Sequence, residues 1–172
     1  DGRLKILRSA EVTADMFIQT DHHIVPFWHV GGKKISYRPL KIGDRASLWT
    51  YLDWMLSASS NAAASMVIRE LMLLVHFKEQ YPITDEQIHG FFSRTSKKEL
   101  TALLFRALQE PITRNGLDLE HLRQGSLFTW KGKQLVPGTT SYASPRELMR
   151  FMVKLEQGKL IDAFSSREIK RL

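Results

Sequence analysis

Cysteine is absent from the 172 residues of this chain. That absence excludes disulfide frameworks, thiolate zinc sites and cysteine nucleophiles. Glycine, with 10 residues, and proline, with 6, are too scarce for a collagen-like or low-complexity chain. No apolar run approaches the roughly 20 residues that cross a bilayer, so we expect no membrane span in this chain. The sequence begins at Asp1 with neither Met nor a signal-like apolar segment, which suggests a processed or excised chain.

The composition that remains is that of a folded protein. Hydrophobic residues make up 43% of the chain, and 9 Phe, 4 Trp and 4 Tyr supply too much apolar surface for disorder. A chain of this length buries about 70% of its unfolded surface and needs no metal to hold it. We therefore expect residues 1–172 to form a single region with its own core.

The formal net charge is +7, a balance that is found in nucleic-acid-binding proteins. The basic residues, however, occur singly or in pairs such as Lys33–Lys34 and Lys97–Lys98, with acidic residues between them. This pattern favours a solvated basic surface, so we expect no nucleic-acid partner. A basic helical domain that binds nucleic acid is the least favoured interpretation of the chain.

Residues 1–43 are expected to form a lead-in of strands and turns. Two β-prone runs, Ile24–Val30 and Ile35–Tyr37, flank a Gly-Gly turn and predict a small hairpin. Pro26 would place the first strand at a sheet edge.

Residues 44–172 are expected to be helical. One helix carries an apolar face up to Leu56, residues 57–61 form a polar break, and a long buried helix follows to Val75. Four later helices are expected to begin at capping boxes, in which Ser or Thr precedes Glu or Gln by three residues. These pairs are Thr84 with Gln87, Ser96 with Glu99, Ser144 with Glu147, and Ser165 with Glu168. Pro111 and Gly158 are expected to mark helix ends.

An irregular stretch at about 112–143 is expected to be an Ω-type loop, with only Leu117–Gln124 helical. Loops of this length inside compact domains are usually functional or disordered, and the aromatic residues here favour a packed loop. The predicted fold class is therefore mainly α, with a small N-terminal β hairpin.

Candidate catalytic residues are few. The six histidines show no metal-binding spacing, and no phosphate-cradling glycine loop is present, so we expect neither a metal nor another cofactor. The unusual feature is Ser59-Ser60-Asn61, which places a hydroxyl and an amide two residues apart at a break between helices. A serine at this position also fits a helix N-cap, in which Ser59 or Ser60 satisfies free backbone amides.

The surrounding sequence resembles a known superfamily. Trp49–Ala64 resembles the second motif of the serine β-lactamases and penicillin-binding proteins: a helix ending in Leu or Met, two spacer residues, Ser-x-Asn and then small residues. Gly138–Leu148 is similar to the segment that closes the family's Ω-type loop, and Leu155–Asp162 resembles the end of the next helix. The resemblance covers roughly residues 40–172 and is greatest to class A-type enzymes.

The resemblance implies an α/β fold of the β-lactamase/transpeptidase type, and a serine that attacks an amide or lactam carbonyl to form an acyl-enzyme. Ser59 would match the serine that relays a proton to the leaving nitrogen. Asn61 would match the amide that hydrogen-bonds the substrate and the catalytic lysine. The partner would be a peptide-like or β-lactam-like small substrate, and the family is usually periplasmic or secreted.

The departures from the family pattern are informative. Ser60 replaces the usual Asp, and neither Ser-x-x-Lys nor Lys-Thr/Ser-Gly occurs in this chain. The family resemblance therefore implies an interior piece of a larger enzyme, with the nucleophile outside these residues. We expect these 172 residues alone to have no hydrolase activity.

Glu120 is a further candidate, because class A enzymes carry a Glu on this loop that activates the deacylating water. A surface carboxylate at this spacing is the simpler interpretation of Glu120, and it would favour a peptidase-like or degenerate enzyme. The main alternative for the whole chain is a non-catalytic helical interaction domain, including a degenerate relative of the family.

Overall fold

The structure is a computed structural model that describes residues 2–28 and 34–171. Helices account for 56% and strands for 12%, so the mainly helical class expected from the sequence is confirmed. Among the described residues, no helix has the length and apolar character needed to cross a membrane.

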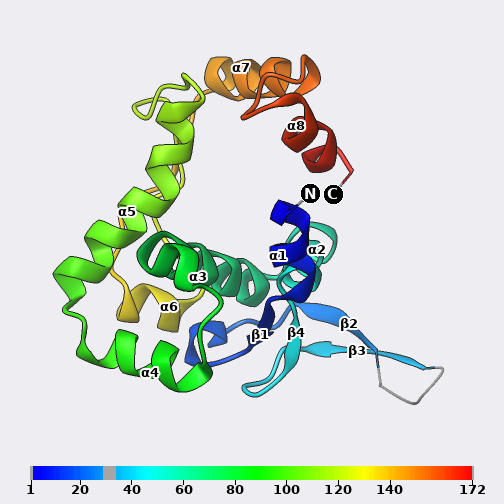
Figure 1. The fold of residues 1–172 in the computed structure, drawn as a ribbon, viewed down its shortest axis with the longest axis vertical. Coiled ribbons are helices and arrows are strands. Elements are labelled where there is room, and N and C mark those ends of the chain that lie inside the picture. Colours follow the sequence, from blue (N-terminus) through cyan, green and yellow to red (C-terminus); the bar gives the residue numbers. More distant parts are fainter. Residues whose placement is uncertain (1, 29–33, 172) are drawn as a thin grey trace.

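Four of the strands lie in the first third of the chain, and two short strands lie between later helices (Figure 1). The helices are α1 (Gly2–Ser9), η1 (Met16–Ile18), α2 (Leu48–Ser57), α3 (Asn61–Phe77), η2 (Lys78–Gln80), α4 (Asp85–Arg94), α5 (Lys97–Arg114), α6 (Trp130–Leu135), α7 (Pro145–Glu156) and α8 (Ala163–Ile169). The strands are β1 (Glu11–Thr13), β2 (Ile24–Trp28), β3 (Ile35–Pro39), β4 (Arg45–Ser47), β5 (Leu122–Arg123) and β6 (Tyr142–Ala143). They pair antiparallel as β1–β4, β2–β3 and β5–β6.

Helix α3 lies at the centre of the molecule, between α5 on one side and α1 and α2 on the other (Figure 1). It begins at Asn61, the last residue of the predicted break, because Ser60 caps it and a run of small and apolar residues follows. Its buried face joins α2, α5 and η1 in the main hydrophobic core. The largest fully buried apolar side chains of that core include Phe17, Tyr51, Met66, Met72, Leu73, Leu104 and Leu127.

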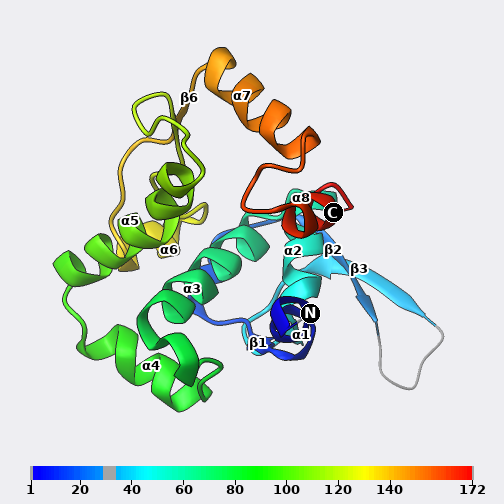
Figure 2. The same cartoon turned by 45° about the horizontal axis from the view of Figure 1, so that its top comes forward.

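The expected hairpin is present as β2–β3 and projects from the body in both views (Figure 2). Its turn and the last residues of the predicted first strand lie outside the described residues. Pro26 lies in a two-stranded sheet opposite Tyr37, where every strand is an edge strand, as expected. The lead-in differs from the prediction in beginning with α1, whose Lys, Leu and Arg residues favour a helix because they lose little rotamer freedom in one.

The capping boxes predicted the helix starts with mixed success. Thr84 and Ser96 form complete capping boxes at α4 and α5. Ser144 caps α7, with Pro145 at the first position, but the Glu147 carboxylate accepts the backbone N–H of Asp118 at 2.8 Å instead of completing the box. Glu147 therefore ties α7 to the segment that follows α5.

The fourth predicted capping box, at Ser165, is wrong. Helix α8 begins earlier, because the carboxylate of Asp162 accepts the backbone N–H of Ser165 at 2.7 Å. Ser166 is fully buried, and its hydroxyl bonds the backbone of Leu160 in both directions. These contacts fix the first turn of α8 before the predicted start.

Pro111 lies inside α5 and does not end it, contrary to the prediction. A proline near a helix end removes only one backbone hydrogen bond of the last turns. The continuation to Arg114 places Ile112 against a second, smaller apolar cluster of Leu117, Leu155 and Leu160, which includes α7. This packing favours the extra turn.

Leu117–Gln124 is not helical, contrary to the prediction. Asp118 accepts the backbone N–H of Glu120 at 2.9 Å, a local turn that competes with a helix. The next residues form β5, which pairs with β6. The long loop at 112–143 also contains a helix, α6, that the sequence analysis did not predict.

Gly125 and Gly138 lie where two backbone segments of this loop approach each other closely. A Cβ on Gly138 would lie 2.3 Å from the carbonyl oxygen of Gly125, and a Cβ on Gly125 would lie 2.6 Å from the carbonyl oxygen of Thr139. The two backbone segments approach so closely that neither position accepts a side chain without a shift.

Candidate functional site

The break between α2 and α3 contains one exposed serine and one buried serine. Ser60 is buried, caps α3 by accepting the backbone N–H of Ala63 at 3.1 Å, and confirms the N-cap interpretation for this one residue. Ser59 has φ of 50° and is exposed. A left-handed backbone is uncommon for a residue with a side chain and marks a sharp turn. Asn61 follows at the first position of α3 and is half-buried.

Asp21 holds this turn in place. Its carboxylate accepts the Ser60 hydroxyl at 3.0 Å and the backbone N–H of Ala62 at 2.7 Å, and it also contacts the Nδ1 atom of His23. Burial of the Asp21 carboxyl opposes ionisation, but the hydrogen bonds from His23, Ala62 and Ser60 outweigh it and lower the pKa of Asp21. An ionised carboxylate at the start of α3 is also favoured by the helix dipole.

We call Asp21, His23, Ser59, Ser60 and Asn61 the Ser59 site. The side chains of Ser59 and Asn61 bond no other residue in the described part of the chain, which leaves a hydroxyl and an amide available to a bound molecule. Both are at least partly exposed. The described residues contain no cluster of three or more potential metal ligands, so the arrangement is one of hydrogen-bonding groups.

A distant segment is anchored one helical turn beyond Asn61. Ser65 is fully buried, and its hydroxyl oxygen accepts the backbone N–H groups of Phe128 and Thr129 at 3.1 and 3.0 Å. Residues four apart share one face of a helix, so this segment crosses the face of α3 that carries Asn61. The backbone N–H of Lys131 also donates to the carbonyl of Gln19 at 2.8 Å. Three separate parts of the chain therefore converge beside the Ser59 site.

Glu120, the third candidate from the sequence, is not part of this site in the described contacts. It is exposed, and its backbone N–H bonds Asp118 in the turn between α5 and β5. In Figure 1 the end of α5 lies toward α7, away from the start of α3. The structure brings Ser59 and Asn61 together and leaves Glu120 apart.

A second feature lies farther along α3. Arg69 is 2% exposed, and its guanidinium contacts the carboxylates of Asp15, at 2.6 Å, and Glu70. Tyr81 donates its hydroxyl hydrogen to Glu70 at 2.8 Å. Burial, with the nearby Glu70 charge next in importance, raises the pKa of Tyr81, so this hydroxyl stays protonated and donates.

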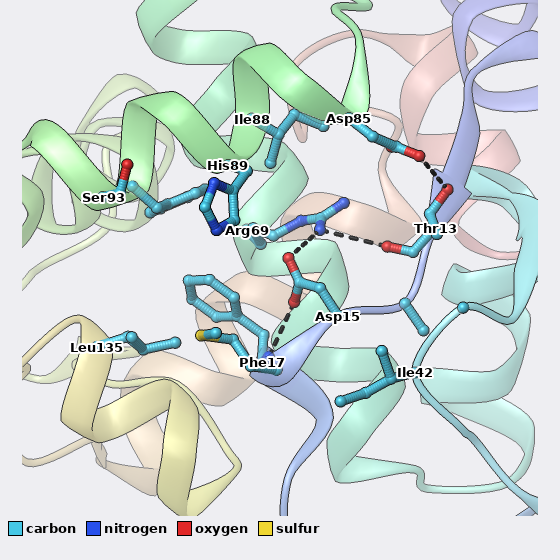
Figure 3. A pocket seen from close by; sticks show the side chains of 14 residues that line it. Thr13, Asp15, Phe17, Ile42, Arg69, Asp85, Ile88, His89, Ser93 and Leu135 are labelled. Carbon is cyan, nitrogen blue, oxygen red and sulfur yellow. Dashed lines mark hydrogen bonds and ion pairs between the residues drawn. The ribbon is translucent and has the colours of Figure 1, made fainter.

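Arg69 and Asp15 of this network line a pocket of about 480 Å³ that lies between β1, η1, α3, α4, α6 and the loop before β4 (Figure 3). We call it the α4 pocket. Figure 3 shows Ile88, His89 and Ser93 of α4 on one side, with Phe17 and Leu135 opposite.

Sequence reasoning missed Asp21 and Arg69. Asp21 precedes two histidines in a polar segment, and nothing local shows that its carboxylate reaches α3. A signal for Arg69 did exist: an arginine and a glutamate, Arg69-Glu70, interrupt an otherwise apolar helix, and charged residues that deep in a core are usually paired. The partners themselves could not be named from the sequence.

Comparison with known proteins adds no relative. No protein-family model, curated protein or solved structure matches the chain. The geometry of the Ser59 site and of the α4 pocket is therefore what carries the functional conclusions.

Proposed function

We propose that this chain is the helical part of a serine acyl-transfer hydrolase, β-lactamase-like or DD-peptidase-like, that acts on an amide or lactam. In this proposal the nucleophilic serine lies outside these residues, and the Ser59 site supplies one wall of the active site. The fold of the complete enzyme would be of the β-lactamase/transpeptidase type, and the enzyme would work in the periplasm or outside the cell.

One observation carries the proposal. Ser60 is buried and hydrogen-bonded to Asp21. Its neighbours Ser59 and Asn61 are at least partly exposed and keep polar groups that bond no other described residue. A helix cap alone requires only one of these residues. The other two present a hydroxyl and an amide on a turn that Asp21 holds in place, and polar groups placed in this way can stabilise developing charge in acyl transfer.

The proposed chemistry assigns each group a step. As the tetrahedral intermediate collapses, the carbon–nitrogen bond breaks, and the Ser59 hydroxyl passes a proton to the departing nitrogen while receiving one from the general acid of the enzyme. The Asn61 amide hydrogen-bonds the substrate and fixes its orientation. Asp21 acts only by positioning the turn, and Glu120 has no role in this scheme.

Labelling of the full-length protein by a fluorescent penicillin tests the proposal. We expect acylation of a serine outside residues 1–172, at a rate that falls by about 10²–10³ in Asn61→Ala, which is the usual cost of losing one preorganised donor. Ser59→Ala should also slow acylation, because the leaving nitrogen loses its proton source.

Ser57→Ala is the matched control, since Ser57 is exposed and donates only to the backbone of Asp53. Its labelling rate should equal that of the wild type. A full-length protein that is never acylated, or one in which Ser59→Ala and Asn61→Ala label at the wild-type rate, contradicts the proposal.

A second candidate is a non-catalytic interaction domain. Helix α7 exposes Leu148, Met149, Met152 and Val153 along one face, with exposed fractions between 45% and 63%. An apolar helix face of this kind usually contacts another surface. Loss of partner binding in Met149→Asp together with unchanged penicillin labelling would assign α7 to binding; a protein that binds a partner through α7 and is never acylated would favour this second function.

A further inference from the structure

We propose that the α4 pocket binds a small organic cation, an ammonium group attached to an aryl or alkyl body. The pocket volume of about 480 Å³ falls in the range of small-molecule sites. Nothing in this proposal depends on the chemistry of the Ser59 site, because Arg69 follows Asn61 by two turns of α3, about 12 Å along the helix axis.

The body of the ligand is set by the apolar lining. Phe17 and Phe92 meet edge to face, with ring centroids 4.9 Å apart, and both line the pocket. Met16, Ile88 and Leu135 complete the apolar wall. A site with this lining gains from burial of an aryl or alkyl group, and its few polar groups decide the charge of the ligand.

The charge of the ligand is set by two carboxylates. Asp15 and Asp85 both line the pocket, with side chains 34% and 55% exposed. The one arginine in the lining, Arg69, has a side chain that is 2% exposed and already contacts Asp15 and Glu70. The positive charge of Arg69 is therefore already paired with carboxylates of the protein and is not available to a ligand.

The local charge stays negative when the nearest ion pairs are included. The Nη2 atom of Arg45 lies 3.3 Å from the Oδ2 atom of Asp85. The same oxygen atom also accepts the Thr13 hydroxyl. Arg69 and Arg45 give two positive charges against three from Asp15, Glu70 and Asp85, so one net negative charge remains in a chain whose formal charge is +7. Among the described lining residues there is no lysine and no unpaired arginine to meet an anionic ligand, and His89 is the one other side chain there that can carry positive charge.

The geometry favours a cation over a neutral ligand as well. Figure 3 shows Asp15 and Asp85 toward Thr13, with Ser93 and Leu135 farther from Thr13 at the other side of the pocket. If the ammonium group of the ligand lies beside Asp85, its apolar body can contact Phe17 and Phe92. The rings of these two residues also attract a nearby cation. A neutral ligand of the same shape would leave the one net negative charge of this cluster without a further partner.

Calorimetric titration of the full chain with 4-phenylbutylammonium, 4-phenylbutanol and 4-phenylbutanoate tests the proposal. We expect the ammonium to bind most tightly, the alcohol more weakly and the carboxylate most weakly. Asp85→Asn should weaken ammonium binding about two- to fivefold, the value of a partly exposed ion pair, and leave the alcohol unchanged. Higher salt should reduce the difference between ammonium and alcohol.

Glu86→Gln is the matched control, because Glu86 lies beside Asp85 in the first turn of α4 and does not line the pocket. It should leave ammonium binding unchanged. Ser93→Phe, which fills the pocket from its exposed side, should abolish binding of all three probes. Equal affinity for ammonium and alcohol, an equal effect of Glu86→Gln and Asp85→Asn, or no ammonium binding at millimolar concentration would overturn the proposal.

Discussion

Ser65 is the buried hydroxyl through which α3 holds the segment before α6, and Ser65→Ala removes that contact while changing little else. The substitution deletes one oxygen atom from a fully buried position, so it leaves a gap smaller than a methyl group. Alanine is the better helix former, so intrinsic propensity opposes the loss slightly. Any destabilisation beyond this comes from the two backbone N–H groups of Phe128 and Thr129 that lose their acceptor.

The expected size follows from those two bonds. A neutral hydrogen bond contributes about 0.5–1.5 kcal/mol, and a buried donor left without a partner costs about 1–3 kcal/mol. The Thr129 N–H is buried and the Phe128 N–H is half-buried, so we expect the first to cost more than the second. Together they predict a loss of about 2–3 kcal/mol in the free energy of unfolding. For a chain of this size that corresponds to a fall of about 4–12 °C in Tm.

Urea denaturation of Ser65→Ala and of the control Ser57→Ala measures this loss, and amide hydrogen exchange locates it. Ser65→Ala should lower the midpoint with an unchanged m value, and faster exchange should be confined first to Phe128, Thr129 and the following turn. Ser57→Ala should change stability by less than about 0.5 kcal/mol. A loss in Ser65→Ala below about 0.5 kcal/mol, or unchanged protection at Thr129, would refute the claim that Ser65 anchors this segment.

Two further predictions follow from other parts of the structure. The folded state lowers the pKa of Asp21, so its ionised carboxylate stabilises the fold above the ordinary aspartate pKa, and this contribution is lost as pH falls through the lower folded value. Asp21→Asn should therefore be less stable than the wild type at neutral pH, with the difference closing on acidification in urea titrations; a difference independent of pH would contradict this. Gly138→Ala should cost about 1–3 kcal/mol because its Cβ would meet the Gly125 carbonyl at 2.3 Å, whereas Gly90→Ala in open space on α4 should stabilise by up to about 1 kcal/mol. Thermal denaturation of the two variants compares them, and equal Tm values would show that the loop relaxes without cost.

Local rules predicted most of the helical part. Ser60, Thr84, Ser96 and Ser144 each cap a helix in the structure, because the capping signal lies within three residues of the helix start. Of the errors, the start of α8 arose from a competing local cap at Asp162, whereas others arose where a contact between distant residues decided the outcome. Part of Leu117–Gln124 forms β5 because it pairs with β6, about twenty residues later in the chain. Helix α5 continues past Pro111 because Ile112 packs against the cluster that includes α7.

The Ser59 site was found from a short motif, but its support was not. The motif identified Ser59 and Asn61, and the capping rule allowed for Ser60. Asp21 precedes Ser60 by 39 residues, and its role depends on a backbone path that no local pattern specifies. Apart from the Arg69-Glu70 pair, the α4 pocket gave no signal, because its walls come from β1, η1, α3, α4, α6 and the loop before β4, which meet only in the folded chain.

One consequence concerns the length of α3 itself. Asn61, Ser65 and Arg69 are spaced four residues apart, so the Ser59 site, the anchored segment and the wall of the α4 pocket lie in phase along one helix. Each residue added or removed between Asn61 and Arg69 would turn one end by about 100° against the other. A substitution elsewhere on α3 leaves this spacing unchanged, whereas an insertion or deletion in this stretch would rotate at least one of the three features away from the others. Conservation of this interval, more than of any single side chain, is what should mark a distant relative that keeps both sites.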